Sequence, residues 1–291
     1  MTESNGSAES FGVRLRSAMT ELGPLCAGID PHPGLLAHWG LDESVAGLER
    51  FAMTCVEAFA GTVAVVKPQS AFFERFGSAG VAVLERTLAG LREAGTLSVL
   101  DVKRGDIGST MTAYAQAYLS QDSPIRADAI TVSPFLGFES LRPAMDLARQ
   151  TGRGLFVLTL TSNPEGAEVQ HALRDGRTVA GSIVDGVTSA NASEAGRGVL
   201  GSTGMVVGAT VGRAVHDLGL DLAGANAPLL APGVGAQGAT AADLATVFGT
   251  AMGNVLASSS REILGTGPDG TALRAAARRT AEQLRVILST S

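Results

Sequence analysis

The most unusual stretch of the chain is LSVLDVKRGDIGST, residues 97–110. An apolar run ends there in four charged side chains within six positions, Asp101, Lys103, Arg104 and Asp106. Only 17% of all residues are charged, so this crowding at the end of a buried strand needs a reason. Asp101 and Lys103 are two residues apart and therefore share one face of an extended strand. A lysine flanked by carboxylates stays protonated in a cleft of low dielectric, where it could donate a proton.

Lysine is rare in this sequence, which makes the two that occur informative. Of the 22 basic residues, all are arginine except Lys67 and Lys103, and both lysines end apolar strands. An ammonium group can lose its proton at accessible pH, whereas a guanidinium effectively cannot. We therefore expect both lysines to have a chemical role beside Asp101. The simpler alternative is a capping carboxylate with an ordinary ion pair, which leaves the second lysine without a role.

Two loops late in the sequence carry groups suited to binding an anion. PGVGAQG, residues 232–238, is a glycine-rich turn in which Gln237 offers an amide donor. SSSREI, residues 258–263, offers the Ser260 hydroxyl and the Arg261 guanidinium, which can hold a phosphate through paired N–H donors. Each loop alone is a weak signal, but both follow the strands after which α/β barrels bind phosphate.

These residues need a scaffold that brings strand ends together, and the hydrophobic pattern predicts one. Eight continuous apolar runs are typical of parallel strands buried on both faces, and each is followed by helical spacing. The predicted strands are 24–30, 62–67, 96–103, 127–133, 154–160, 204–210, 227–233 and 254–260. The predicted helices lie near 42–59, 78–94, 108–121, 138–151, 177–198, 211–219, 240–248 and 269–288. The pattern indicates an α/β fold, a single-domain (β/α)8 TIM barrel, with a doubly wound sheet as the alternative.

The barrel is predicted to span residues 11–291. The polar residues 1–10 are expected to form a flexible N-terminal tail, and residues 161–200 suggest an insertion after the fifth strand. Active sites of such barrels are built at the C-terminal ends of the strands. Asp30 ends the first predicted strand and Lys67 the second, so the scarce charges collect where chemistry is expected.

Composition excludes several classes of protein. A net charge of −6 and a pI near 5.3 predict no basic surface for nucleic acid or anionic membrane. No signal segment and no run of 18 apolar residues occurs, and Cys26 and Cys55 lie in apolar runs, so we expect a soluble, cytoplasmic chain with reduced cysteines. The histidines show no metal-ligand spacing, so no metal site is expected.

The D-x-K-x-x-D run of Asp101, Lys103 and Asp106, continuing through Ile107 to Thr110, resembles orotidine 5′-phosphate decarboxylase. Further segments match in the same order, namely GIDPHP with Asp30, VVKPQSAFF with Lys67, TSNPEG with Ser162, PGVGAQG with Gln237 and SSREI with Arg261. The length is similar to that of the longer, actinobacterial-type branch. The chain departs from the family pattern in residues 161–200 and in the sequence KPQSAFF after the second predicted strand.

This resemblance implies a carboxy-lyase that converts orotidine 5′-phosphate to uridine 5′-monophosphate and carbon dioxide, without a cofactor, in de novo pyrimidine biosynthesis. Lys103 would protonate C6 of the pyrimidine as carbon dioxide leaves, and Asp101 would face the departing carboxylate. Lys67 and Asp106 would complete the charged network, with Asp106 reaching into the site of the partner subunit.

The resemblance also implies a homodimer and a set of substrate contacts. Ile107 and Thr110 would cross the dimer interface beside Asp106. The other expected contacts are Asp30 and Lys67 with the ribose hydroxyls, Ser162 with the pyrimidine edge, and Pro232, Gln237, Ser260 and Arg261 around the phosphate, where loop 232–238 would close as a lid.

Three rival functions stay open at this point. A magnesium-dependent sugar-phosphate decarboxylase or synthase of the same barrel type shares the D-x-K-x-x-D pattern. A Schiff-base aldolase is disfavoured because an imine-forming lysine must be neutral, while flanking carboxylates keep a lysine charged. A barrel without catalytic activity could bind a nucleotide and release no carbon dioxide.

Overall fold

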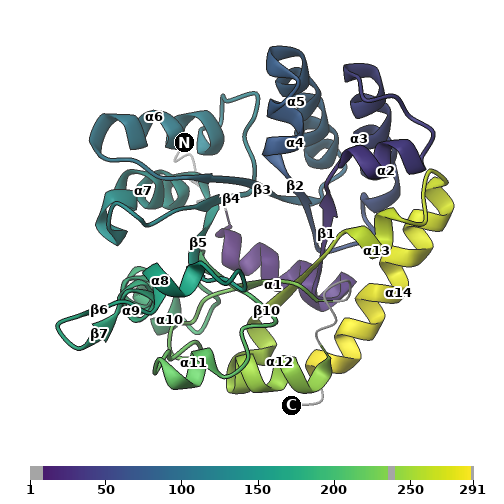
Figure 1. Ribbon diagram of the computed structural model, residues 1–291. Helices are drawn as coiled ribbons and strands as arrows, with labels where there is room; N and C mark the ends of the chain where they lie inside the picture. The colour runs from purple at the N-terminus through teal and green to yellow at the C-terminus, as the bar shows by residue number, and fades with distance from the viewer. Residues whose placement is uncertain (1–8, 235–239, 290–291) are drawn as a thin grey trace, which may run out of the picture.

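The computed structural model describes residues 9–234 and 240–289. Eight parallel strands close into a barrel in the order β1-β10-β9-β8-β5-β4-β3-β2, with helices around its outside (Figure 1). The barrel strands are β1 (Leu25–Ile29), β2 (Val65–Pro68), β3 (Leu97–Arg104), β4 (Ala129–Val132), β5 (Gly154–Leu160), β8 (Thr203–Val207), β9 (Leu229–Pro232) and β10 (Val255–Ser259). All eight predicted strands are present, and the predicted TIM barrel is confirmed.

Most of the predicted helices are also present. Helices close to the predicted ranges are α3 (Val45–Phe59), α5 (Gly77–Glu93), α6 (Gly108–Leu119), η1 (Phe138–Leu141) with α7 (Arg142–Thr151), α12 (Ala241–Phe248) and α14 (Gly270–Ser289). The predicted helix at 211–219 is reduced to α11 (Ala214–Asp217). Elements that the sequence pattern did not predict are α1 (Phe11–Leu22), α2 (Pro33–His38), α4 (Ser70–Glu74), α8 (Gly166–Gln170), η2 (Gly249–Asn254) and α13 (Arg261–Leu264).

Helix α1 closes the N-terminal end of the barrel, and Figure 1 shows it lying across the ring of strands. Phe11 and Leu15 are fully buried there, among the inward-facing side chains of the first halves of the strands. The Phe11 and Phe156 rings pack edge to face with their centroids 6.0 Å apart. Gly154 makes this possible, since a Cβ atom at that position would lie 2.2 Å from the Phe11 ring. The open, polar end of the barrel is therefore the C-terminal one.

The predicted helix at 177–198 is broken into α9 (Val179–Ala190) and α10 (Ala192–Gly196). Asn191 stands at the break with its side chain buried. Its amide nitrogen donates to the carbonyls of Thr203, at 2.8 Å, and Ala225, at 3.1 Å, while its Oδ1 accepts the Thr203 N–H at 3.1 Å. These bonds to the backbone outside the helix fix the change of direction.

The segment between β5 and α9 adds a small substructure to the barrel. It contains α8 and an antiparallel hairpin of β6 (Leu173–Arg174) and β7 (Arg177–Thr178), which projects from the body of the molecule (Figure 1). Helix α9 packs on β5 and β8 and is therefore the barrel helix of this unit. Across both described ranges, no helix combines the length and apolar character that crossing a membrane requires.

Candidate active site

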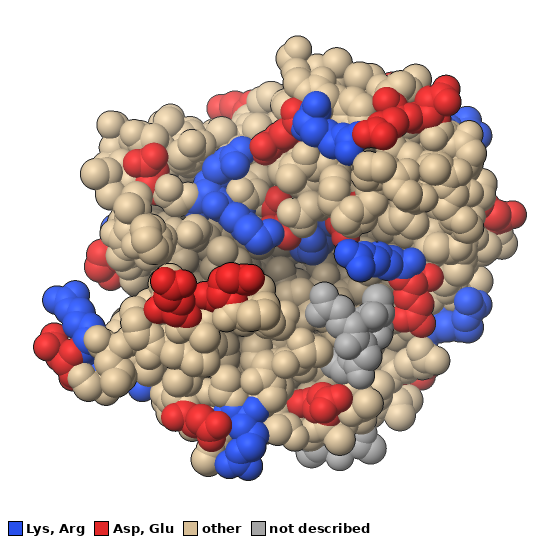
Figure 2. Space-filling model, in the orientation of Figure 1, with Lys and Arg blue, Asp and Glu red and all other residues tan. Residues whose placement is uncertain are grey.

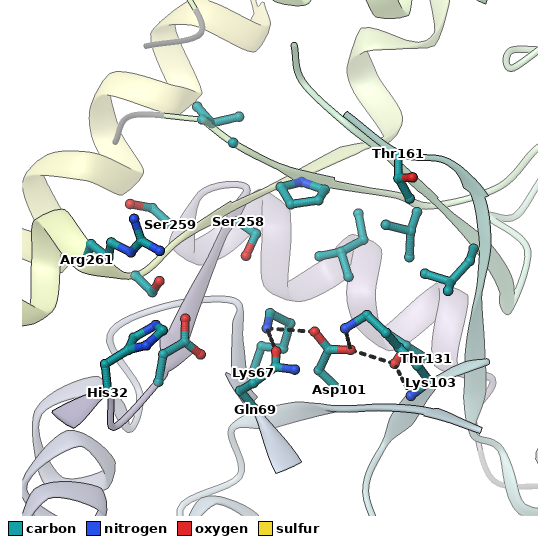
Figure 3. A pocket seen from close by; sticks show the side chains of 18 residues that line it. His32, Lys67, Gln69, Asp101, Lys103, Thr131, Thr161, Ser258, Ser259 and Arg261 are labelled. Atoms are coloured by element: carbon teal, nitrogen blue, oxygen red, sulfur yellow. Dashed lines mark hydrogen bonds and ion pairs between the residues drawn. The ribbon is translucent and has the colours of Figure 1, made fainter. Parts of the chain in front are cut away.

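A cavity of about 340 Å³ opens at the C-terminal ends of the barrel strands. Figure 2 shows the molecule hollowed at its centre, with basic side chains gathered around the hollow. Lys67, Asp101 and Lys103 line one part of the cavity, and the segment 258–261 lines another (Figure 3). The apolar side chains in the lining are Leu158, Val206, Leu230, Pro232 and Val234.

The charged run predicted from the sequence forms a connected network in the cavity (Figure 3). Asp101 lies between two ammonium groups: Lys103 Nζ is 2.6 Å from its Oδ1, and Lys67 Nζ is 3.1 Å from its Oδ2. Lys67 Nζ also donates to Gln69 Oε1 at 3.1 Å. Lys67 and Asp101 are less than 10% exposed, whereas the Lys103 side chain is 47% exposed. The buried pair therefore supports a lysine that can reach a ligand.

The network changes the pKa of its buried members in opposite directions. Burial alone would raise the pKa of Asp101, but the Lys67 and Lys103 ammonium groups and hydrogen bonds from Lys103 and Thr131 lower it to about 2. Burial alone would lower the pKa of Lys67, but the carboxylates of Asp101 and Asp30 raise it above its usual value. Both groups are accordingly charged across the neutral range.

Asp101 and Lys103 both line the cavity, and the part of β3 that carries them is irregular. A regular strand would place them on one face by alternation, but the pairing of β3 with β4 shifts between Leu100 and Arg104. Lys103 also has a positive φ of 47°, in the left-handed region that side chains rarely adopt. The two charged groups therefore meet at a bulge, where the regular alternation of the strand is interrupted. Arg104 is not in the cavity lining, and its guanidinium pairs with Glu74 at 2.7 Å.

Asp30 follows β1 and lines the cavity. Its Oδ1 atom is buried and has no hydrogen-bond partner. A buried carboxylate oxygen in this state is costly unless a ligand donates a hydrogen bond to it. The close approach of the loop after β10 is possible because residue 28 is glycine, where a Cβ atom would lie 2.6 Å from Ser260 Cβ.

The end of β10 and the residues that follow it supply the groups suited to an anion. Ser258, Ser259, Ser260 and Arg261 all line the cavity, and Pro232 of β9 lies in the same lining. The Arg261 guanidinium makes no ion pair with any residue in the described ranges, so its donors are available to a ligand. Gln237 and most of the predicted lid lie outside the described residues.

His32 also lines the cavity, although its sequence context indicated no role. Its ring packs on Phe72 with the centroids 4.2 Å apart, and Figure 3 shows it on the same side of the cavity as Arg261. Burial lowers the pKa of His32, and Asp30 opposes this while Arg261 adds to it. The neutral imidazole is therefore the favoured form at pH 7.

The predicted interface residues Asp106, Ile107 and Thr110 lie outside the cavity lining of this chain. Asp106 Oδ1 accepts the Ile107 N–H at 2.7 Å, at the start of α6. Ile107 is 61% exposed, and Phe135 and Leu136, in the loop after β4, are 77% and 53% exposed. Large exposed apolar side chains such as these are typical of surfaces that bind another protein.

Ser162 is exposed and is not in the cavity lining, which its neighbour Thr161 joins instead. Gln69 and Thr131 are two further lining residues that the sequence reasoning missed. The position of Gln69 two residues after Lys67 could have suggested it, since alternation places both on one face. Nothing in the local sequence pointed to Thr131. Among the described residues, no group of three or more His, Cys, Asp or Glu is placed to hold a metal ion.

Comparison with protein families places this geometry among known proteins. Residues 23–276 match the family described as "Orotidine 5'-phosphate decarboxylase / HUMPS family". A Streptomyces coelicolor protein named orotidine 5′-phosphate decarboxylase is 61% identical over 285 residues, covering 97% of this chain and all of the relative. A Salinispora arenicola protein of the same name is 61% identical over 284 residues, with the same coverage.

Solved structures show the same similarity in three dimensions. A crystal structure from Streptomyces avermitilis, provisionally named an orotidine 5′-phosphate decarboxylase, superposes with a TM-score of 0.93 at 59% identity, covering all of both chains. The Leishmania donovani OMP decarboxylase has a TM-score of 0.74 at 28% identity, covering 96% of this chain and 99% of its own.

Proposed function

This chain belongs to the orotidine 5′-phosphate decarboxylase / HUMPS family, and on that basis we propose that it converts orotidine 5′-phosphate to uridine 5′-monophosphate and carbon dioxide. The observation that carries the proposal is the Lys67–Asp101–Lys103 network, which faces a cavity whose other side offers Arg261. A charged network beside an anion-binding segment suits a substrate with a carboxylate at one end and a phosphate at the other.

The reaction needs a cation close to one carbon atom. When the bond between C6 and the carboxylate breaks, its electron pair stays on C6 and carbon dioxide departs. Lys103 Nζ then gives a proton to C6, which forms the C6–H bond and leaves an amine that regains its proton from water. An ammonium about 4 Å from the developing carbanion contributes roughly 4 kcal/mol at an effective dielectric of 20.

One lysine does not supply the whole rate enhancement, because reactions with very high barriers can require more than about 20 kcal/mol. Binding energy at the remote phosphate contributes the rest by fixing the substrate in the reactive position. Arg261, Ser260 and Pro232 line the cavity at the phosphate end, and Gln237, which lies outside the described residues, keeps the phosphate-binding role that the resemblance implies. Asp30 Oδ1, buried without a partner, accepts a hydrogen bond from a ribose hydroxyl, and Lys67 donates to the ribose from the next strand. The resemblance assigns the contact with the pyrimidine edge to Ser162, which directly follows the lining residue Thr161.

The active form of the protein is a homodimer. Asp106, Ile107 and Thr110 do not reach the cavity of their own chain, and they share the barrel rim with the exposed Phe135 and Leu136. Packing this rim against a second copy buries the apolar side chains. It also carries Asp106 toward the partner's lysines, where it completes the alternating charges.

The proposed activity is tested by incubating the purified chain with orotidine 5′-phosphate and measuring carbon dioxide and uridine 5′-monophosphate separately. We expect one carbon dioxide for each nucleotide formed, without added metal. Binding of the nucleotide with no carbon dioxide released would indicate a non-catalytic barrel. Turnover of a keto-acid sugar phosphate alone, and only with magnesium, would indicate the sugar-phosphate branch of the same barrel type.

A further inference from the structure

The charged groups of the site depend on an irregularity in β3, and one side chain of β4 spans it. The two strands pair regularly up to Leu100 and again from Arg104, so residues 101–103 lie opposite Thr131 alone. Three residues cannot all find backbone partners on one residue of the neighbouring strand. Thr131 is 1% exposed, and its hydroxyl takes the place of the missing backbone partners.

We infer that Thr131 is a positioning residue for the decarboxylation, an inference that rests on the proposed function of the site. Its hydroxyl holds the bulge that carries Asp101 and Lys103. Thr131 acts through these two residues, and it sets both the direction of the carboxylate and the path of the lysine backbone.

The hydrogen bonds of this hydroxyl leave it no freedom. Oγ1 accepts the backbone N–H groups of Val102, at 3.0 Å, and Lys103, at 2.9 Å. A hydroxyl has two acceptor lone pairs and one donor hydrogen, so both lone pairs are occupied. The remaining hydrogen points to Asp101 Oδ1, which is 2.8 Å away. That oxygen is the one that also accepts from Lys103 Nζ at 2.6 Å (Figure 3).

The backbone of Lys103 needs this support. Its φ of 47° lies in the left-handed region, where a non-glycine residue persists only if its surroundings hold it. Thr131 Oγ1 binds the N–H of Lys103 itself. Removing the hydroxyl leaves one buried and one partly buried N–H group without this partner, and the bulge can relax toward a regular strand. That relaxation moves Lys103 Nζ away from the position where Asp101 now holds it.

Three substitutions separate the hydroxyl from the shape of the side chain. Thr131→Val keeps the shape and removes the hydroxyl, whereas Thr131→Ser keeps the hydroxyl and removes a methyl group. Thr131→Ala also lacks the hydroxyl, and its smaller side chain avoids placing a second methyl group against the two N–H groups. Thr159→Val is the matched control, because Thr159 is fully buried on β5, its hydroxyl donates to the Val157 carbonyl, and it does not line the cavity.

The measurement is kcat and KM for orotidine 5′-phosphate, together with the dissociation constant of uridine 5′-monophosphate. We expect Thr131→Val to lower kcat by about 10- to 100-fold with KM and product binding changed less than about threefold, because the misplaced group acts in the chemical step. Thr131→Ser should stay within about threefold of wild type, and Thr159→Val should match wild type.

Several results would overturn the inference while leaving the proposed function intact. They are a wild-type kcat in Thr131→Val or Thr131→Ala, and a loss in Thr131→Ser as large as in Thr131→Val. A higher KM and weaker product binding with an unchanged kcat would also contradict the inference, since Thr131 would then be a binding residue. If Thr131→Val does not fold, comparing kcat of the alanine and serine variants shows whether the hydroxyl is required. Absence of turnover by the wild type would instead reject the proposed function.

Discussion

Asp101 is the residue on which the site depends most, because it is buried between two lysines and needs both of them. Its pKa falls from 3.8 to about 2 on folding, so the folded protein favours the carboxylate more than the unfolded chain does. The resulting stabilisation is fully present above pH 4 and is lost as the pH falls toward 2. Lys67 makes stability depend on pH in the opposite direction. Its pKa is raised on folding, so its contribution to stability is present below its ordinary pKa of 10.5 and is lost at higher pH.

We predict that ionisation of Asp101 contributes about 2 kcal/mol to the free energy of unfolding at pH 5 and that this is lost by pH 2. Chemical denaturation at a series of pH values measures it. Asp101→Asn should be less stable at pH 5, because Lys67 loses its carboxylate partner, and its stability should fall less steeply between pH 4 and 2. Equal slopes for the two proteins in that window would show that Asp101 is not the group responsible.

Arg261 belongs to the phosphate end of the proposed substrate. We predict that Arg261→Ala lowers kcat/KM for orotidine 5′-phosphate by roughly 100- to 1,000-fold, because two charge-assisted hydrogen bonds are lost. Slow decarboxylation of orotidine, which lacks the phosphate, should be unchanged within about twofold in the same variant. Arg278→Ala is the matched control, since Arg278 lies exposed on α14. An equal loss with both substrates would place Arg261 in the chemistry instead.

Residue spacing predicted the charged groups of the site but not the contacts that hold them. Asp101 and Lys103 could be identified because scarce charges stand out against an apolar strand. Thr131 could not, because its role depends on a hydrogen bond to a residue 30 positions earlier, across a strand bulge that leaves no local signal. Ser162 was chosen by resemblance, and the structure places its neighbour Thr161 in the cavity lining.

At the scale of elements, the strands were predictable and the exceptions to the repeat were not. Continuous Val/Ile/Leu/Ala runs identify buried parallel strands because both faces are covered. Helix α1 precedes the first strand and lies outside the strand–helix alternation, so the repeating pattern did not predict it. The break in the helix at Asn191 could not be predicted from local sequence, because its cause is a set of hydrogen bonds to distant carbonyls.

Helix α1 contributes to stability and not to chemistry, because it lies at the opposite end of the barrel from the cavity. We predict that Phe11→Ala lowers the free energy of unfolding by about 3–5 kcal/mol, through lost burial and the cavity left behind. Phe11→Leu keeps most of the volume and should cost about 1–2 kcal/mol. Chemical denaturation gives these values, and kcat of the folded variants should equal that of wild type. A lower kcat in a fully folded Phe11 variant would mean that α1 is coupled to the active site.

At the scale of the whole molecule, the described cavity lacks the carboxylate that the charge pattern assigns to Asp106. The proposed dimer supplies it from the second copy, which mixing experiments test directly. Lys103→Ala and Asp106→Ala homodimers should each be nearly inactive. After subunit exchange, a heterodimer has one site with neither substitution and one site with both.

We predict that a mixture of the two variants recovers about a quarter of wild-type activity, because random exchange gives about half heterodimers with one complete site each. Sedimentation analysis of the mixture establishes that dimers are present. No recovery after demonstrated exchange would mean that Asp106 serves the site of its own chain. Ile107→Asp, on the exposed rim, should shift the protein toward monomers and lower its activity in parallel.

The most direct test of the whole account follows the absorbance loss of orotidine 5′-phosphate in excess chelator, for wild type and for Lys103→Ala. We predict wild-type turnover that chelator does not reduce, and a fall of at least about 1,000-fold in the variant, because the variant has no acid at C6. Turnover that survives in Lys103→Ala would contradict the assignment of the proton donor. Wild-type activity abolished by chelator would contradict a mechanism based on this lysine network alone.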